Sequence, residues 1–303
     1  MEVFRTPDER FEGLAGYAFE PHYSDLETEM SGLRMHYVDE GAGDPILLLH
    51  GEPTWAYLYR KMIPALSEGG RVIAPDFIGF GRSDKVTDLG WYSYDRHCES
   101  LVQLIEALDL TDITVVVQDW GGPIGLRVAT ENAQRFARLV ILNTGVFRPG
   151  PGWPTPGFQA WRDWAEKNPD MPIGFVIQGA TSTELSPEVI AGYEAPFPDV
   201  ASKAGAAAFP LIVPLKEDDP GAAEMADVRA ALGRWDKPAL VAFSDSDPVF
   251  PQAAGEKMAE RIPGAVSFVG IPGASHFLQE DAGETIAGHV ARFIEGVEGV
   301  SGS

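Results

Sequence analysis

An aspartate at the end of a strongly hydrophobic run is the most reactive candidate in the sequence. Val115 to Val117 are consecutive valines, typical of a strand buried on both faces, and Gln118, Asp119 and a Trp-Gly-Gly turn follow them. This pattern predicts a sharp strand-to-helix turn that holds its central residue out of the sheet. A carboxylate that attacks a saturated carbon forms an ordinary ester, whereas attack on an acyl carbon would form a reactive anhydride. The alternative is that Asp119 only caps the following helix.

A second acid and a histidine follow two later strands. The predicted strand 239–243 leads into Asp245 and Asp247, and the predicted strand 267–269 leads into His276. The chain order Asp119, Asp247, His276 is nucleophile, acid and base, as in α/β hydrolases. In such a set the first carboxylate forms a covalent ester, the histidine activates water, and the second carboxylate orients the imidazole.

A tight loop follows another buried run. The run 46–49 ends in His50-Gly51-Glu52-Pro53-Thr54-Trp55, and backbone N–H groups in such a loop can form an oxyanion hole. We interpret His50 itself as a structural histidine. The glycines of the loop 75–84 lack Gly-x-Gly-x-x-Gly spacing, so no dinucleotide site is expected there.

Alternating strands and helices would position these residues. The pattern predicts a half-exposed strand at 33–39, buried or partly buried strands at 46–49, 71–74, 115–117, 138–142, 239–243 and 267–269, and helices near 95–108, 120–129 and 222–232. This alternation indicates a mostly parallel sheet flanked by helices. Residues 146 to about 215 are rich in proline and aromatic residues and break the pattern, which indicates an inserted lid.

Composition excludes several classes of partner. The 303 residues include 45 acidic and 23 basic side chains, and the formal net charge of −22 disfavours nucleic acid and anionic membranes. Cys98 is the only cysteine, which excludes an intramolecular disulfide and a cysteine-cluster metal site. No apolar run approaches about 18 residues and no signal-peptide pattern opens the sequence, so a cytoplasmic enzyme is expected. A saline habitat is one hypothesis for the acidic excess.

The motifs together resemble those of a known enzyme family. His50 to Trp55, Val116 to Gly122 and Gly273 to Phe277 match the haloalkane dehalogenases of the α/β-hydrolase superfamily, in the subgroup with an Asp-His-Asp triad and two halide-binding tryptophans. The resemblance covers nearly the whole chain and is weaker at 146–190. It implies an α/β-hydrolase fold with a mostly parallel central sheet and an inserted helical cap. The implied division is core 1–145, cap 146–215 and core 216–303.

Roles carry over from this resemblance residue by residue. Asp119 is the nucleophile, His276 the base, and Asp247 fits the triad acid better than Asp245, which leaves Asp245 as a solvated turn residue. Trp120 and Trp161 are the halide ligands, with Trp164 as the alternative to Trp161, and the backbone N–H groups of Glu52 and Trp120 form the oxyanion hole. Apolar residues expected to line the pocket are Phe158, Phe197, Val249 and Phe250. Val117 departs from the small residue usual two positions before the nucleophile.

The implied reaction converts a haloalkane and water into a primary alcohol and a halide ion through an ester on Asp119. No cofactor and no metal are needed, and a monomer or weak homodimer is expected. The nearest alternative is an epoxide hydrolase, which would use tyrosine donors in the lid, where residues 146–215 contain only Tyr193. A fluoroacetate-type dehalogenase would need cationic residues near Asp119. A non-catalytic α/β hydrolase that binds a small apolar ligand is the remaining alternative.

Overall fold

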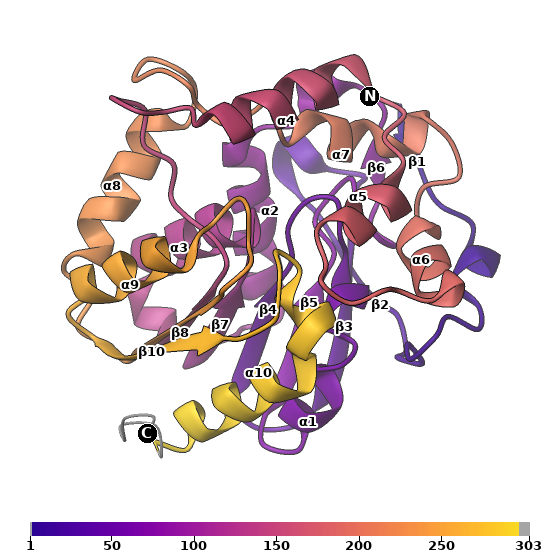
Figure 1. Cartoon of the computed structure of the whole chain (residues 1–303). Coiled ribbons are helices and arrows are strands. Elements are labelled where there is room, and N and C mark those ends of the chain that lie inside the picture. Colours follow the sequence, from indigo (N-terminus) through magenta and orange to yellow (C-terminus); the bar gives the residue numbers. More distant parts are fainter. Residues whose placement is uncertain (1, 297–303) are drawn as a thin grey trace.

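An eight-stranded sheet forms the centre of the computed structural model, which describes residues 2–296 (Figure 1). Its order is β10-β9-β8-β7-β4-β5-β3-β2. The strands are β2 (His22–Asp25), β3 (Arg34–Gly41), β4 (Pro45–Leu49), β5 (Arg71–Pro75), β7 (Ile113–Val117), β8 (Phe136–Leu142), β9 (Ala239–Ser244) and β10 (Ala265–Ile271). The valine and leucine runs of β7 and β4 lie at its middle, and every residue in both strands is buried.

Most of the sheet is parallel. The pairs from β10 through β5 are parallel, and only β3 runs antiparallel to its neighbours β5 and β2. The expectation of a half-exposed strand at 33–39 is wrong, because Met35, His36, Tyr37 and Val38 are all buried. Polar His36 is buried because its Nδ1 pairs with the Asp76 carboxylate at 2.7 Å.

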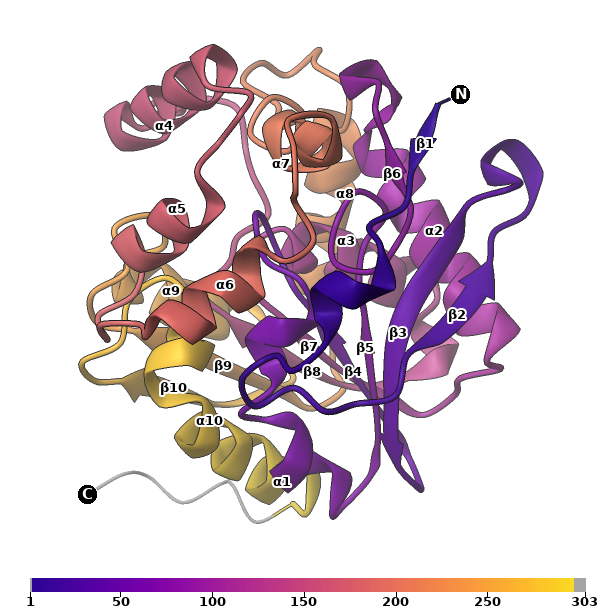
Figure 2. The ribbon, with the colours of Figure 1, turned by 90° about the vertical axis from the view of Figure 1, so that its right-hand side faces the viewer.

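Helices cover both faces of the sheet. One face carries α1 (Ile63–Ser67) and α10 (Leu278–Ile294), and the other carries α2 (Tyr94–Ala107), α3 (Gly121–Glu131) and α8 (Ala222–Leu232) (Figure 2). A further helix, α9 (Gln252–Arg261), packs on β9 and β10. The face of α2 predicted to be apolar is buried at Cys98, Leu101, Leu104 and Ile105.

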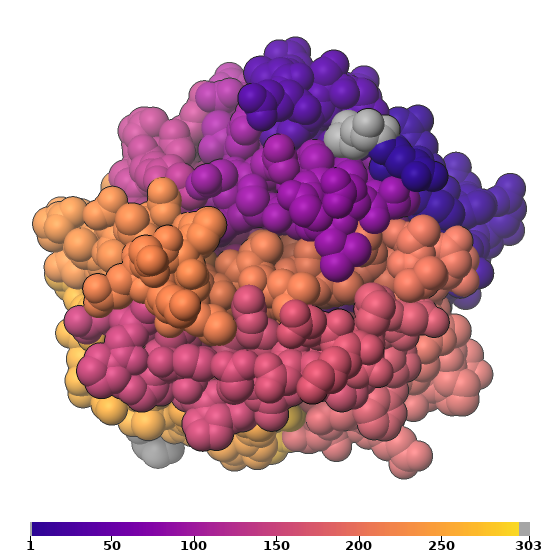
Figure 3. Space-filling view, turned by 90° about the horizontal axis from the view of Figure 1, so that it is seen from above, coloured from indigo at the N-terminus to yellow at the C-terminus, as the bar shows by residue number. Residues whose placement is uncertain are grey.

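The segment between β8 and α8 forms four short helices above the carboxyl ends of the strands. These are α4 (Pro156–Lys167), α5 (Ile173–Gly179), α6 (Pro187–Glu194) and α7 (Ala204–Ala208). Seen from this end, the pink and orange segment covers much of the molecule (Figure 3). Thr155 and Ser186 cap α4 and α6 through their hydroxyl groups, and a proline follows each cap.

The remaining elements are short. A two-stranded sheet pairs β1 (Val3–Phe4) with β6 (Lys85–Val86). Single turns of 3-10 helix occur at Asp8–Phe11, Thr28–Met30, Ala56–Tyr59, Leu89–Trp91, Ala133–Arg135 and Ala201–Lys203. Within residues 2–296, no helix is both long and apolar enough to cross a lipid bilayer. The Gly/Ser-containing sequence after Val297 predicts a frayed tail, and this prediction lies outside the described residues.

Candidate active site

Asp119 occupies a strained turn between β7 and α3. Its φ of 48° lies in the left-handed region that non-glycine residues rarely adopt. Two contacts to the end of β8 hold it there: its N–H donates to the Asn143 carbonyl at 3.0 Å, and the Thr144 hydroxyl donates to its carbonyl at 2.5 Å. A Cβ at Gly122 would lie 1.9 Å from Thr144 Oγ1, so only glycine lets the helix come this close.

The carboxylate of Asp119 does not cap the helix that follows. Trp120 takes the N-cap position of α3, where no side chain caps the helix. The Asp119 carboxylate instead accepts a hydrogen bond from the Glu52 N–H, at 2.8 Å to Oδ1. The alternative that Asp119 serves as a helix cap is therefore wrong.

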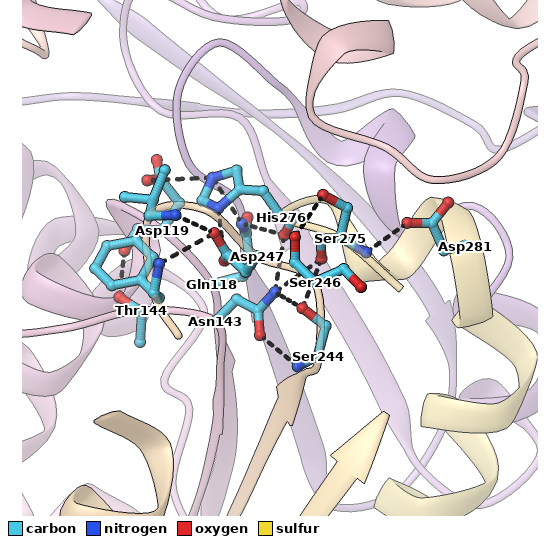
Figure 4. Close-up of polar contacts among 12 residues, drawn as sticks. Gln118, Asp119, Asn143, Thr144, Ser244, Ser246, Asp247, Ser275, His276 and Asp281 are labelled. Carbon is cyan, nitrogen blue, oxygen red and sulfur yellow. Dashed lines mark hydrogen bonds and ion pairs between the residues drawn. The ribbon is translucent and has the colours of Figure 1, made fainter. Parts of the chain in front are cut away.

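His276 lies between two carboxylates (Figure 4). Its Nδ1 is 2.9 Å from Asp247 Oδ2, and its Nε2 is 3.6 Å from Asp119 Oδ2. The other oxygen of Asp247 accepts the N–H groups of Val249 at 2.7 Å and Phe250 at 3.0 Å, which fixes the carboxylate. All these groups come from loops at the carboxyl edge of the sheet, where open α/β sheets place their ligands.

Asp245 has a different environment from Asp247. It is exposed, and its carboxylate accepts the Gly273 N–H at 3.1 Å. This interaction closes the turn that precedes His276.

The electrostatic environment of His276 favours its charged form. Burial lowers the pKa of the imidazole, but the negative charge of Asp247 and the hydrogen bond and charge of Asp119 outweigh that effect and raise the pKa to about 10. His276 therefore favours its protonated form at neutral pH. Loss of the Asp119 charge would remove one of the two causes of this elevation.

Two buried side-chain amides that the sequence analysis did not predict support the loop that carries Ser275 and His276. Gln118 Nε2 donates to the His276 carbonyl at 3.2 Å and lies 3.3 Å from His276 Nε2. Asn143 Nδ2 donates to the carbonyl of Ser275 at 2.9 Å and to the Ser244 hydroxyl at 2.7 Å. Their signal in the sequence is a polar residue directly after a buried strand, which marks the edge of the sheet where the site forms.

A largely apolar cavity of about 360 Å³ lies over Asp119, between the sheet and the cap. Its lining includes the predicted Glu52, Trp120, Phe158, Trp161, Val249, Phe250 and His276, together with Phe147, Trp164, Phe175 and Phe277. Trp161 and Trp164 both line it, with ring centroids 5.4 Å apart in a stacked arrangement. Phe197 does not line this cavity, so its prediction is wrong. It is buried instead, because its ring packs edge-on against Phe80 in the core, with ring centroids 6.4 Å apart.

Two other polar residues near the site have distinct environments. Both nitrogens of His50 are used, with Nδ1 donating to the Gly51 carbonyl at 2.8 Å and Nε2 accepting the Phe77 N–H at 3.0 Å, in agreement with a structural role. The Glu52 side chain is buried, and its Oε1 has no hydrogen-bond partner among residues 2–296. Burial first, and then the charge of Asp119, raise the pKa of Glu52 well above its usual range.

Comparison with known proteins identifies the family. Residues 44–186 match the alpha/beta hydrolase fold family. A haloalkane dehalogenase of Mycobacterium marinum is 48% identical over 295 residues, which cover 95% of this chain and 98% of that protein. Haloalkane dehalogenase 1 of Mycobacterium tuberculosis is 51% identical over 296 residues, which cover 95% of this chain and 97% of that protein. The chain belongs to the haloalkane dehalogenases.

Structural comparison agrees with this membership. The tetrameric haloalkane dehalogenase DpaA from Paraglaciecola agarilytica superposes with a TM-score of 0.91 at 35% identity, covering 95% of this chain and 97% of that one. The predictions of an α/β-hydrolase fold and of a hydrolase acting on carbon–halide bonds are confirmed.

The lid of this haloalkane dehalogenase lacks the tyrosine donor that an epoxide hydrolase would need. Tyr193 is fully buried and does not line the cavity over Asp119. Its hydroxyl donates to the Glu280 carboxylate. The geometry therefore gives the epoxide alternative no support.

Proposed function

We propose that Asp119 is the nucleophile of a two-step dehalogenation, and that its Oδ2 makes the attack. The observation that carries this proposal is the Asp119 carboxylate at the floor of an apolar cavity, with one oxygen already bound by the Glu52 N–H at 2.8 Å. Because Oδ1 is held by that N–H group, Oδ2 is the oxygen free to displace halide in line from the substrate carbon. The C–X electron pair leaves with the halide, and an alkyl ester forms.

The departing halide would be stabilised by the indole N–H groups of Trp120 and Trp161. Both indoles line the cavity, whose walls are mostly aromatic and aliphatic. Neutral N–H donors in a water-poor cavity stabilise a developing anion and still release it, whereas a buried cation would hold the product more tightly. Trp164 lines the same cavity beside Trp161 and remains the alternative second ligand.

His276 would act only in the second step. Once Asp119 is esterified its negative charge is gone, so the pKa of His276 falls from about 10 and the neutral imidazole becomes accessible. The imidazole then takes a proton from water as the water oxygen attacks Cγ of the ester, while Asp247 stabilises the imidazolium. Negative charge collects on Oδ1, next to the N–H groups proposed for the oxyanion hole, those of Glu52 and Trp120. Collapse of the intermediate transfers the proton on His276 to the leaving alkoxide, and the second proton of the water, left on the carboxyl group of Asp119, is released to solvent to regenerate the carboxylate.

Bromide release from 1,2-dibromoethane tests the role of Asp119. Wild-type enzyme should release bromide continuously, and Asp119→Ala should release none above background. Styrene oxide serves as the second substrate, because diol formation without bromide release would move the assignment to an epoxide hydrolase. Continued bromide release by Asp119→Ala would show that another residue is the nucleophile.

A histidine variant separates the two steps. In His276→Phe the ester should form and persist, so we expect a burst of one bromide per enzyme molecule and an alkylated Asp119 peptide in mass spectra. Multiple turnovers by this variant would exclude His276 as the essential base. Single Trp161→Phe and Trp164→Phe variants, compared by bromide binding, distinguish the two candidate halide ligands.

We also propose the core and cap boundaries 1–145, 146–215 and 216–303. In solution we expect a monomer or weak homodimer, which light scattering measures. A cytoplasmic location is a further proposal, which cell fractionation tests.

A further inference from the structure

A second cavity, of about 240 Å³, lies between α8, α9 and the segment after β8. We call it the α8–α9 groove, and its lining consists of Thr144, Gly145, Val146, Arg229, Leu232, Phe250, Ala254, Lys257, Met258, Arg261 and Ile262. The cationic side chains are Arg229, Lys257 and Arg261, and the lining contains no acidic residue. In a chain with a formal net charge of −22, a cavity with only cationic charges is unexpected.

The cations of the groove are not neutralised by nearby carboxylates. Across residues 2–296, none of the three forms an ion pair. Glu256 on α9 is hydrogen-bonded to Gln252 instead. The half-buried Arg229 has a lowered pKa, first through burial and then through the like charges of Arg261 and Arg148. An anion in the groove would relieve this repulsion.

Arg229 is the best placed of these cations to bind an anion. Its Nη1 donates to the Val146 carbonyl at 3.2 Å, which fixes the guanidinium beside the groove while leaving further N–H groups available. A planar guanidinium binds a carboxylate through two parallel hydrogen bonds, and partial burial strengthens such a pair.

The rest of the lining favours an anion that carries an apolar tail. Val146, Leu232, Phe250 and Ile262 are buried core residues whose surfaces border the groove. The cavity is smaller than the pockets of about 300–1,000 Å³ that hold drug-sized ligands, which favours a small molecule. We propose that the α8–α9 groove binds a short-chain alkanoate, with its carboxylate at Arg229, Lys257 and Arg261 and its tail on this apolar wall.

The groove shares a wall with the catalytic cavity. Phe250 lines both. Its N–H donates to Asp247 at 3.0 Å, and its ring stacks on His276 with centroids 5.9 Å apart. Thr144, which also lines the groove, donates to the Asp119 carbonyl. A bound tail would press on residues that hold all members of the proposed triad, so occupancy of the groove alters turnover. The expected effect of groove occupancy on turnover rests on the proposed function.

Calorimetric titration with sodium hexanoate tests binding without any turnover. We expect saturable binding to the wild-type chain, weakened about tenfold or more in Lys257→Gln/Arg261→Gln, since charge-assisted contacts are lost. Both side chains are exposed and lack ion pairs, so the variant should fold, and circular dichroism verifies this. The matched control Lys167→Gln/Lys216→Gln removes the same charge from exposed positions outside the groove and should bind hexanoate as wild type does.

Further probes separate the groove from the catalytic cavity. Asp119→Asn removes a negative charge from the catalytic cavity, so binding there would tighten, whereas binding in the groove should not change. Hexanol and inorganic phosphate, which lack the charge and the tail respectively, should each bind more weakly than hexanoate. Equal hexanoate affinity in wild type and Lys257→Gln/Arg261→Gln, or tightening in Asp119→Asn, would overturn the proposed site.

Turnover measurements test the coupling separately. Saturating hexanoate should change kcat for bromide release at least about twofold in wild type and leave Lys257→Gln/Arg261→Gln unaffected, because a tail held on Phe250 constrains the loop of Asp247. Binding with an unchanged kcat would overturn the coupling while leaving the site in place. Absence of bromide release from every form would count against the proposed function and not against the groove.

Discussion

Gln118 precedes the proposed nucleophile, yet its side chain serves the histidine. Its amide lies 3.3 Å from His276 Nε2 and donates to the His276 carbonyl at 3.2 Å, and the whole side chain is buried. An N–H group directed at an imidazole nitrogen stabilises the neutral ring more than the charged ring. Gln118 is therefore a positioning residue that also favours the basic form of His276.

Substitution of Gln118 should change the pH dependence of ester hydrolysis. In Gln118→Leu the pKa that governs this step should rise by up to about one unit, since a single hydrogen bond of about 1 kcal/mol is lost. In the proposed mechanism ester hydrolysis needs neutral His276, so its rate should increase with pH through that pKa and then level. Single-turnover decay of the alkyl-enzyme against pH measures the shift. Gln118→Asn, which keeps the amide, is the matched variant, and a uniform loss of rate without a shifted profile would argue for a purely structural role.

His97 is a buried histidine outside the proposed chemistry. Neither ring nitrogen has a hydrogen-bond partner among residues 2–296, and the ring packs on Phe209 with centroids 4.6 Å apart. Burial, and then the neighbouring His50, lower its pKa to about 3. In the unfolded chain the pKa of His97 is near 6.5, so between about pH 6.5 and 3 its ring binds a proton there that it does not bind in the folded chain. Acidification through this window therefore favours unfolding.

Replacement of His97 should make the protein less sensitive to acid. Between pH 6 and pH 4.5 the free energy of unfolding should fall less steeply in His97→Phe than in wild type. The difference in slope should be up to about 1.4 kcal/mol per pH unit, because the variant lacks the one proton that His97 takes up on unfolding. Urea unfolding across this range measures it. His22 is exposed, so His22→Phe provides the control and should leave the slope unchanged. Equal slopes for His97→Phe and wild type would show that folding does not lower the pKa of His97.

At the scale of whole elements, a buried ionic cluster ties the cap to the core. Glu280 at the start of α10 accepts the hydroxyl of Tyr193 from α6 and pairs with the Arg60 guanidinium, whose Nη2 is 2.9 Å from Glu280 Oε2. These three side chains are buried. Because α10 begins just after His276, the cluster also restrains the histidine loop.

Removal of single members of this cluster should destabilise the protein by graded amounts. Tyr193→Phe deletes one hydrogen bond to a buried charge and should cost about 1.5–3 kcal/mol in the free energy of unfolding. Arg60→Leu leaves the Glu280 carboxylate buried without its main partner and should cost about 3–5 kcal/mol. The double variant Arg60→Leu/Glu280→Leu should recover part of the loss. Urea unfolding measures all three, and an Arg60→Leu chain as stable as wild type would contradict the assigned role.

The elements of the core could be predicted from sequence and those of the cap could not. Strands such as β7 and β4 are continuous apolar runs buried on both faces, so hydrophobicity alone identifies them. The cap helices α4 and α6 have few buried residues of their own, since α4 buries only Ala165 and α6 only Gly192 and Tyr193, so no apolar stripe marks them in the sequence. The same limit applies to β3, where His36 is polar yet buried because its partner Asp76 lies 40 positions away.

The candidate site shows the same division between local and distant information. Asp119, Asp247 and His276 each follow a strand, and parallel strands bring their carboxyl ends to one edge. Lining residues such as Phe175 and the excluded Phe197 depend on how the cap packs on the core. Gln118 and Asn143 owe their roles to hydrogen bonds with a loop more than 100 residues later, which no local pattern reveals.

For the whole molecule, the largest electrostatic feature is its excess of negative charge. With 45 acidic and 23 basic side chains, the folded state carries a formal net charge of −22, and like charges held on one compact surface repel one another. Salt shortens the range of this repulsion from about 30 Å at 0.01 M to about 10 Å at 0.1 M. Added salt should therefore stabilise the folded chain at neutral pH.

The urea midpoint at pH 7.5 should rise as NaCl increases from 0.02 to 0.5 M, most steeply at the low end, where the screening length changes most. The same series at pH 4.5, the predicted isoelectric point, separates screening from specific binding of chloride in the catalytic cavity. Repulsion is minimal at that pH, so screening predicts little change. Stabilisation by bound chloride would persist, because the indole N–H groups of Trp120 and Trp161, the proposed halide ligands, do not titrate. An equal rise at both pH values would assign the effect to halide binding, and no rise at pH 7.5 would show that the acidic surface does not limit stability.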